Sequence, residues 1–130
     1  MSLRIVRLGA PRQPGEGLRI GTVRRPPRGV PKGDYARLDY YDTWLPELAP
    51  SPELVKEAQG AADDKAWQAF VRKYRAEMNR PEANHLLDLL VALSHQSNLS
   101  VGCYCEHEAR CHRSVLRELL RERGATMAEP

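Results

Sequence analysis

Proline and glycine are unevenly distributed along this chain of 130 residues, and their distribution limits what its first part can form. Seven of the ten prolines and six of the nine glycines fall within the first fifty residues. Because both residues interrupt regular structure, this part is expected to hold short strands joined by loops. Longer periodic segments begin only after residue 50.

Four short segments are predicted to be extended. Three of them alternate apolar with polar residues, and this period of two is typical of a half-buried strand. The fourth is rich in aromatic residues, which favour strands, and its Tyr40, Tyr41 and Trp44 are expected to pack in the core. The three alternating segments are 3–8, 18–23 and 98–104, and the aromatic segment is 36–45.

Helix signals begin at Ser51, a capping residue that precedes a proline at the first helical position. Farther along, apolar residues recur at steps of three and four, which is typical of amphipathic helices. Leu86, Leu90 and Leu93 are expected to mark the buried face of one of these helices. The predicted helices are 51–60, 64–79, 81–94 and a last one that starts in the segment 111–114 and ends at Gly124.

This order of elements predicts an α/β fold: a single compact layered domain with a small mixed or parallel sheet covered by about four helices. The domain is expected to span residues 1–124, followed by a short tail at 125–130. In open α/β sheets, ligands bind beyond the carboxyl ends of the strands. The last predicted strand runs at that end into a loop rich in cysteine and histidine, so we expect the functional site there.

Composition narrows the class of protein. The formal net charge of +3 permits attraction to a phosphate-bearing partner, either a small molecule or a nucleic acid. No apolar run approaches the roughly 20 residues that span a bilayer, so no membrane partner is expected. The three cysteines lie within nine positions and no secretory segment is evident, which indicates reduced thiols in the cytoplasm.

The cysteine loop admits a metal site as one interpretation. Cys103, Cys105, Cys111 and His112, with His107 in reserve, provide the thiolates and imidazole that tetrahedral zinc prefers. However, the single residue between the first two cysteines is fewer than zinc turns usually have. The alternative is that Cys103 packs in the core as part of its strand.

A second interpretation is a reactive cysteine. Four residues separate Cys105 from Arg110 and five separate Cys111 from Arg117, spacings found in sulfurtransferase and cysteine-phosphatase loops. Neither segment has the glycines that such anion-binding loops use. Because Cys111 stands at the start of a predicted helix, we expect it to have the lowest thiol pKa and to act as nucleophile or redox thiol, with His112 as its proton partner.

The third interpretation, an anion site, is the leading one. Free backbone N–H groups at a helix start bind phosphate, and a basic loop after the second strand can supply further charge if the second and last strands are neighbours. We therefore expect a phosphorylated ligand, such as a nucleotide or a nucleic-acid phosphate, between the loop 24–32 and the last helix. The predicted ligand-binding residues are Arg24, Arg28, Lys32, Arg113 and Ser114.

These motifs resemble those of the YeaO-like DUF488 family, whose function is unknown. The resemblance covers nearly the whole chain, including the segment 44–51 and a helix that carries Phe70, Tyr74 and Glu77. The end of the last strand and the Cys-His-Arg sequence at 111–113 resemble a variant of the wider family. The resemblance implies a compact α/β fold and no established substrate, cofactor or catalytic residue. The matching residues of the basic loop are Arg24, Pro27, Arg28, Gly29 and Lys32, with Pro26 where the family usually has tryptophan.

Overall fold

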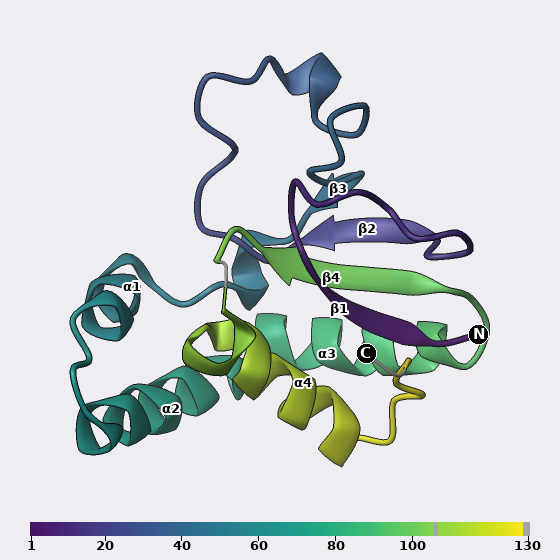
Figure 1. Cartoon of the computed structure of the whole chain (residues 1–130). Helices are drawn as coiled ribbons and strands as arrows, with labels where there is room; N and C mark the ends of the chain where they lie inside the picture. Colours follow the sequence, from purple (N-terminus) through teal and green to yellow (C-terminus); the bar gives the residue numbers. More distant parts are fainter. Residues whose placement is uncertain (106, 129–130) are drawn as a thin grey trace.

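The structure is a computed structural model, and it describes residues 1–105 and 107–128. Four parallel strands form one sheet in the order β1-β4-β2-β3 (Figure 1). The last two residues of the predicted tail, 129–130, lie outside the described residues. The strands are β1 (Leu3–Arg7), β2 (Leu18–Gly21), β3 (Thr43–Trp44) and β4 (Leu99–Cys103), and the helices are α1 (Pro52–Gln59), α2 (Asp64–Met78), α3 (Pro81–Ser94) and α4 (His112–Glu122).

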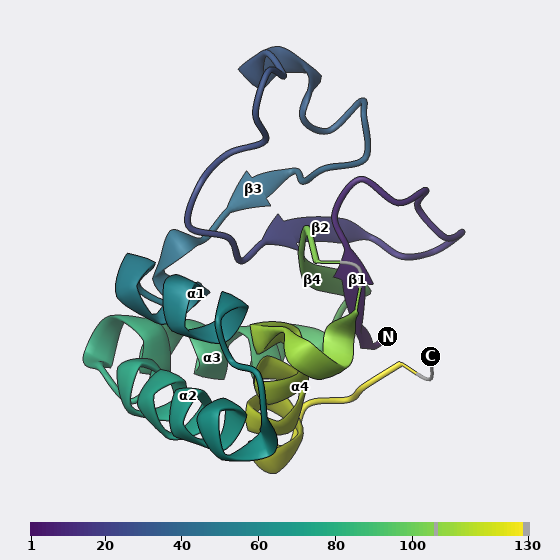
Figure 2. The same ribbon diagram turned by 60° about the vertical axis from the view of Figure 1, so that its left-hand side comes forward.

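The two faces of the sheet are covered differently. Helices α2, α3 and α4 pack on one face, whereas the loops 8–17 and 22–42 lie on the other (Figures 1 and 2). The α/β class predicted from the order of elements is therefore confirmed, with an all-parallel sheet. Within the described part of the chain, no helix is long and apolar enough to cross a membrane.

Strand β4 lies at the centre and is buried along its whole length. Leu99 and Val101 join the core formed with the helices, and Ser100 faces the loops on the opposite side. Gly102 leaves no space for a side chain, because an added Cβ would collide with the carbonyl oxygen of Val6 in β1. A central parallel strand that is covered on both faces needs this mixture of apolar and small residues.

Two of the helices begin at a capping side chain, and the first of these caps is the predicted Ser51. Ser51 accepts a hydrogen bond from the N–H of Leu54 at the start of α1, and Asp63 does the same for α2. The buried face of α3 differs from the prediction: Leu90 is buried, but Leu86 and Leu93 are only partly so. The residues of α3 that face the core are Ala83, Leu87, Leu90 and Ser94.

The aromatic segment 36–45 is mostly not extended, which corrects the prediction. Asp39 has a φ of 64°, a left-handed turn conformation, and only Thr43 and Trp44 form a strand. Tyr41 is buried against Gly21, but Trp44 is 38% exposed on the edge of the sheet and donates to the carbonyl of Val23. Turn geometry overrides strand propensity here.

A buried ion pair fastens the loops to the sheet. Arg19 of β2 donates to both carboxylate oxygens of Glu16, at 2.8 and 2.9 Å, and the two side chains are 1% and 2% exposed. Ser100 of β4 donates to the same carboxylate. Burial alone would raise the pKa of Glu16, but the hydrogen bonds from Arg19, the N–H of Gln13 and Ser100 lower it overall.

Replacing Glu16→Gln should lower the free energy of unfolding by about 3 kcal/mol, because it leaves the buried Arg19 charge without a counter-charge. The exposed bidentate pair between Arg75 and Glu122 provides a matched control. There, Glu122→Gln should cost less than about 1 kcal/mol. Urea unfolding followed by circular dichroism measures both changes in the free energy of unfolding. Equal decreases would show that the buried pair stabilises the fold no more than the exposed pair does.

Candidate functional site

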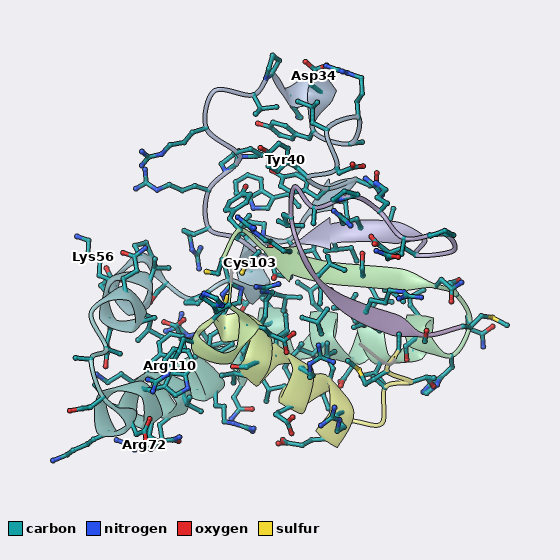
Figure 3. The ribbon with its side chains drawn as sticks, in the orientation of Figure 1. Asp34, Tyr40, Lys56, Arg72, Cys103 and Arg110 are labelled. Carbon is teal, nitrogen blue, oxygen red and sulfur yellow. The ribbon has the colours of Figure 1, made fainter. Side chains whose placement is uncertain are left out.

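The cysteine loop connects the end of the central strand to the start of a helix. Cys103, which is labelled in Figure 3, is the last residue of β4, and Cys111 is the N-cap of α4. Strand β2 pairs with β4 in parallel, so both strands end on the same side of the sheet. Thr22, the residue after β2, therefore lies at the carboxyl end of the strands, near Cys103. Elements that are distant in the sequence thus meet where ligands bind in parallel sheets.

Two of the three thiols are buried against each other. The Sγ atoms of Cys103 and Cys111 are 2.8 Å apart, and the two residues are 2% and 3% exposed. Cys105 is exposed at the surface, and the two buried thiols influence its pKa. The site therefore contains one accessible thiol on the loop between two inaccessible ones.

These contacts separate the pKa values of the thiols. Hydrogen bonds from Cys103 and Cys111, together with the positive charge of Arg113, lower the pKa of Cys105. The pKa of Cys103 is raised, because its hydrogen bonds to the other two thiols hold its proton and because it is buried. The hydrogen bond with Cys103 would lower the pKa of Cys111, but its bond to Cys105 and its burial raise it overall. The low thiol pKa predicted for Cys111 is therefore wrong and belongs to Cys105.

His112 is a buried neutral imidazole with a fixed tautomer. Its Nε2 lies 2.7 Å from the carbonyl oxygen of Thr22, so Nε2 carries the proton and donates it. Nδ1 is left with its lone pair facing the Sγ of Cys111 at 3.7 Å. Burial lowers the pKa of His112 to about 4, although the Thr22 carbonyl opposes the shift. The ring of Tyr74 packs edge-on against the imidazole.

Arg113 brings a buried positive charge beneath the loop. It is 4% exposed and its Nη2 donates to the carbonyl oxygen of Cys105 at 2.6 Å. Within residues 1–105 and 107–128, its Nε has no hydrogen-bond partner. A buried guanidinium with an open donor favours a negative charge nearby, and the Cys105 thiolate supplies one.

The two predicted cysteine–arginine loops are not formed as anion cradles. Arg110 donates to Asp64 and lies over the ring of Trp67, so it turns toward α2, where Figure 3 shows it. Arg117 makes two hydrogen bonds with the carboxylate of Glu108. Both guanidinium groups are thus directed away from the cysteine with which the spacing pairs them.

The predicted phosphate residues are only partly brought together. Because β2 and β4 are parallel neighbours, the basic loop and the start of α4 both follow the carboxyl ends of these strands, as expected. However, Arg24 donates to the carbonyls of Pro50 and Ala49, and Ser114 donates to the carbonyl of Cys111. Arg28 and Lys32 are exposed. Backbone carbonyls therefore already accept hydrogen bonds from three of the five predicted ligand-binding residues: Arg24, Arg113 and Ser114.

A donor set for a metal ion is present. The Sγ atoms of Cys103 and Cys111 and a ring nitrogen of His112 lie within 4.8 Å of one another and can hold a metal ion. Two thiolates bound to tetrahedral zinc are about 3.8 Å apart, as the Zn–S bond length requires. The 2.8 Å separation of these sulfurs means that they must move apart before they bind zinc.

Sequence reasoning missed the groups that position this site. Thr22 fixes the histidine tautomer through a backbone carbonyl, and the sequence signal for it was only its place after a strand. Tyr74 was visible as part of a helix pattern, but its hydroxyl donates to the carbonyl of Leu48 while its ring covers His112. Neither role can be read from residue spacing.

Together these features define an α/β domain with a cysteine and histidine cluster at the carboxyl end of its central parallel strand. A family model described as "Active DUF488-N3 subclade" matches residues 3–124. The uncharacterized protein YeaO of Escherichia coli (strain K12) is 30% identical over 123 residues, which are 93% of this chain and 98% of that protein. No solved structure matches the chain. The chain belongs to the DUF488 family, which confirms the resemblance seen in its sequence.

The lowered pKa of Cys105 predicts alkylation that changes little with pH. An ordinary thiol loses reactivity about tenfold for each pH unit below its pKa of about 8.5, because its thiolate becomes scarce. Cys105 should instead react with iodoacetamide at nearly the same rate at pH 8 and pH 6, whereas Cys103 and Cys111 should react only after unfolding. Peptide mass spectrometry measures all three rates. A roughly hundredfold fall in the Cys105 rate across this range would contradict the prediction.

Proposed function

We propose that this protein carries out thiol–disulfide exchange, with Cys105 as the nucleophile and the buried cysteines as resolving thiols. The observation that carries the proposal is the exposed thiol of Cys105 on the short loop between two buried cysteines whose sulfurs are 2.8 Å apart. Such chemistry needs an accessible thiolate and a second thiol within reach. It also fits the reducing cytoplasm, where the sequence indicates free thiols.

The reaction begins when the Cys105 thiolate attacks one sulfur of a substrate disulfide. A mixed disulfide forms, the substrate S–S bond breaks, and one substrate thiolate leaves and takes up a proton. Cys111 then attacks the sulfur of Cys105, so that a Cys105–Cys111 bond forms and the second substrate thiol leaves. Exchange with Cys103 moves this bond to the buried pair and frees Cys105. Two electrons pass from two protein thiols to the substrate.

Neighbouring residues supply the charge and proton handling for these steps. Arg113 stabilises the Cys105 thiolate, and its buried guanidinium makes no ion pair with a carboxylate among the described residues. His112 faces Cys111 with an unprotonated Nδ1, which accepts the thiol proton during the attack. Cys111 and His112 thus take the roles of redox thiol and proton partner, while Cys105 replaces Cys111 as the first nucleophile.

Treating the reduced protein with oxidised glutathione tests this order. The unmodified chain should lose two hydrogens and form an internal disulfide. The Cys105→Ser variant should react at least about tenfold more slowly, because only buried thiols of raised pKa remain. The double variant Cys103→Ser, Cys111→Ser, which keeps no resolving thiol, should instead accumulate a glutathione adduct on Cys105. Intact and peptide mass spectrometry identify these products, and an unchanged rate for Cys105→Ser would refute the proposal.

Zinc binding is an alternative use of the same donors. The Nε2–H of His112 donates to the Thr22 carbonyl and leaves Nδ1 toward the thiols, an arrangement common among metal-binding histidines. The native mass of the same reduced protein, purified without chelator, separates the two uses. A zinc-sized excess that chelator removes, with a lowered Tm, would support zinc. A bare native mass and chelator-insensitive melting would leave thiol exchange.

A phosphorylated ligand at the start of α4 is the second candidate function. It is favoured by the open Nε of buried Arg113 next to a helix start whose N-cap side chain accepts no hydrogen bond from the backbone N–H groups of α4. A phosphate group there would receive the Nε–H and backbone N–H groups of α4. The basic loop would supply Arg28 and Lys32 rather than Arg24, whose donors bind carbonyls.

Arg113→Lys should weaken inorganic phosphate binding about tenfold if this candidate is right, because lysine loses the directed Nε donor but keeps the charge. Arg72→Ala, which removes an exposed arginine of α2, is the control. Two-dimensional NMR should show phosphate-dependent shifts at residues 112–114. Phosphate binding that is equal in both variants would remove the candidate.

A further inference from the structure

A cavity lies beside β1, the strand at one edge of the sheet. Its volume is about 510 Å³, and it lies between the loop 10–16, the open side of β1 and helix α4. Neither the three cysteines nor His112 lines it. Its walls combine aliphatic side chains with four arginines: Arg4, Arg7, Arg19 and Arg117.

The arginines differ in how they are engaged. Arg19 is neutralised by Glu16, which among the described residues is the only acidic one that lines the cavity, and Arg117 makes a bidentate pair with Glu108. Arg4 is partly exposed and has no hydrogen bond or ion pair within the part of the chain described by the structure. The lining therefore offers a guanidinium that a negatively charged ligand can pair with bidentately.

The backbone of β1 adds polar groups at the same place. Leu3 receives a backbone hydrogen bond from Ala128 and donates one to Thr126. The outward-facing N–H and C=O groups at the start of β1 are therefore already paired. Alternate residues of a strand face the same side, so the N–H and C=O groups of Ile5 also point away from β4, past the end of that bridge. Ile5 and Ala128 both line the cavity.

Two cavity residues also hold the cysteine loop. The Nε of Arg7 donates to the carbonyl of Tyr104, between Cys103 and Cys105. The guanidinium of Arg117 donates two hydrogen bonds, of 2.6 and 2.8 Å, to the carboxylate of Glu108, which lies between Cys105 and Cys111 in the loop. An anion that binds Arg117 weakens the attraction between its guanidinium and the Glu108 carboxylate, which would loosen the segment that carries the reactive thiol.

We propose that this cavity binds a small organic molecule carrying an oxyanion, phosphate or carboxylate, which Arg4 and Arg117 hold, and that its binding releases the cysteine loop. The aliphatic walls, which include Ile5, Val6 and Pro11, accommodate the body of the molecule. The ligand acts on the loop through the Arg117–Glu108 pair. The binding claim stands by itself, whereas the effect on Cys105 rests on the proposed thiol function.

Calorimetric titration of the full chain with phenyl phosphate, benzoate and inorganic phosphate tests the site. At least one organic anion should bind, and the stronger of the two identifies the oxyanion. Arg4→Ala and Arg117→Gln should each weaken it about tenfold or more, the loss expected for a charge-assisted hydrogen bond. Arg4→Lys, which keeps the charge, should lose less, and Arg72→Ala should change nothing.

Two results would overturn the site: no binding of either organic anion, or binding that depends on Arg113 and not on Arg4 or Arg117. The bound anion should also raise the Cys105 alkylation rate at least about threefold, because a freed loop exposes the thiol more. An unchanged rate with intact binding would overturn the coupling alone. Since affinity is measured without cysteine chemistry, failure of the thiol function leaves the binding result readable.

Discussion

The buried pair of Glu16 and Arg19 joins strands β2 and β4 to the loops 8–17 and 22–42. Its carboxylate receives hydrogen bonds from β2, β4 and the loop after β1, and the guanidinium also donates to the carbonyls of Ala10 and Asp39. No α-helix covers this face of the sheet in the described structure, and the pair holds the covering loops against the strands. Such a buried pair is stable because every donor and acceptor around it is satisfied.

The thiol cluster depends on the same tight packing of the sheet. Gly102 lets β1 approach β4 closely, and Cys103 follows it directly at the strand end. The loop returns to Cys111, whose position is fixed as the N-cap of α4 and by contact with Cys103. Two buried sulfurs are held by regular structure, and the exposed one lies on the loop between them. Because of this placement, the two thiols proposed to resolve the mixed disulfide are held rigidly, whereas the thiol proposed to react first is accessible.

Much of the architecture was predictable because it follows from periodicity. The strands at 3–8, 18–23 and 98–104 and the helices were identified from apolar spacing, caps and breakers, which are local signals. The prediction of an extended aromatic segment was wrong, because the turn at Asp39 determines the path of the backbone there and strand propensity does not. Its aromatic residues divide accordingly, with Tyr41 inside and Trp44 at the surface.

The candidate site was predictable in position but not in its division of roles. Cysteine and histidine content pointed to the right loop, and the strand-to-helix pattern placed it at the right end of the sheet. The pKa of Cys105 depends on contacts with Cys103, Cys111 and Arg113, and no spacing rule reveals which thiol is exposed. Arg24 likewise reads as a free cation, although its donors are taken by the carbonyls of the segment before α1.

The bridge between Leu3 and Met127 brings the two ends of the described chain onto one strand. Figure 1 shows them together at the amino ends of the strands, opposite the end where Cys103 lies. A short linker between them would close the backbone into a ring without crossing the thiol site. New ends can then be opened in the turn at 60–63, between α1 and α2, where no strand is cut. The order of the elements along the chain is therefore separable from their arrangement in space.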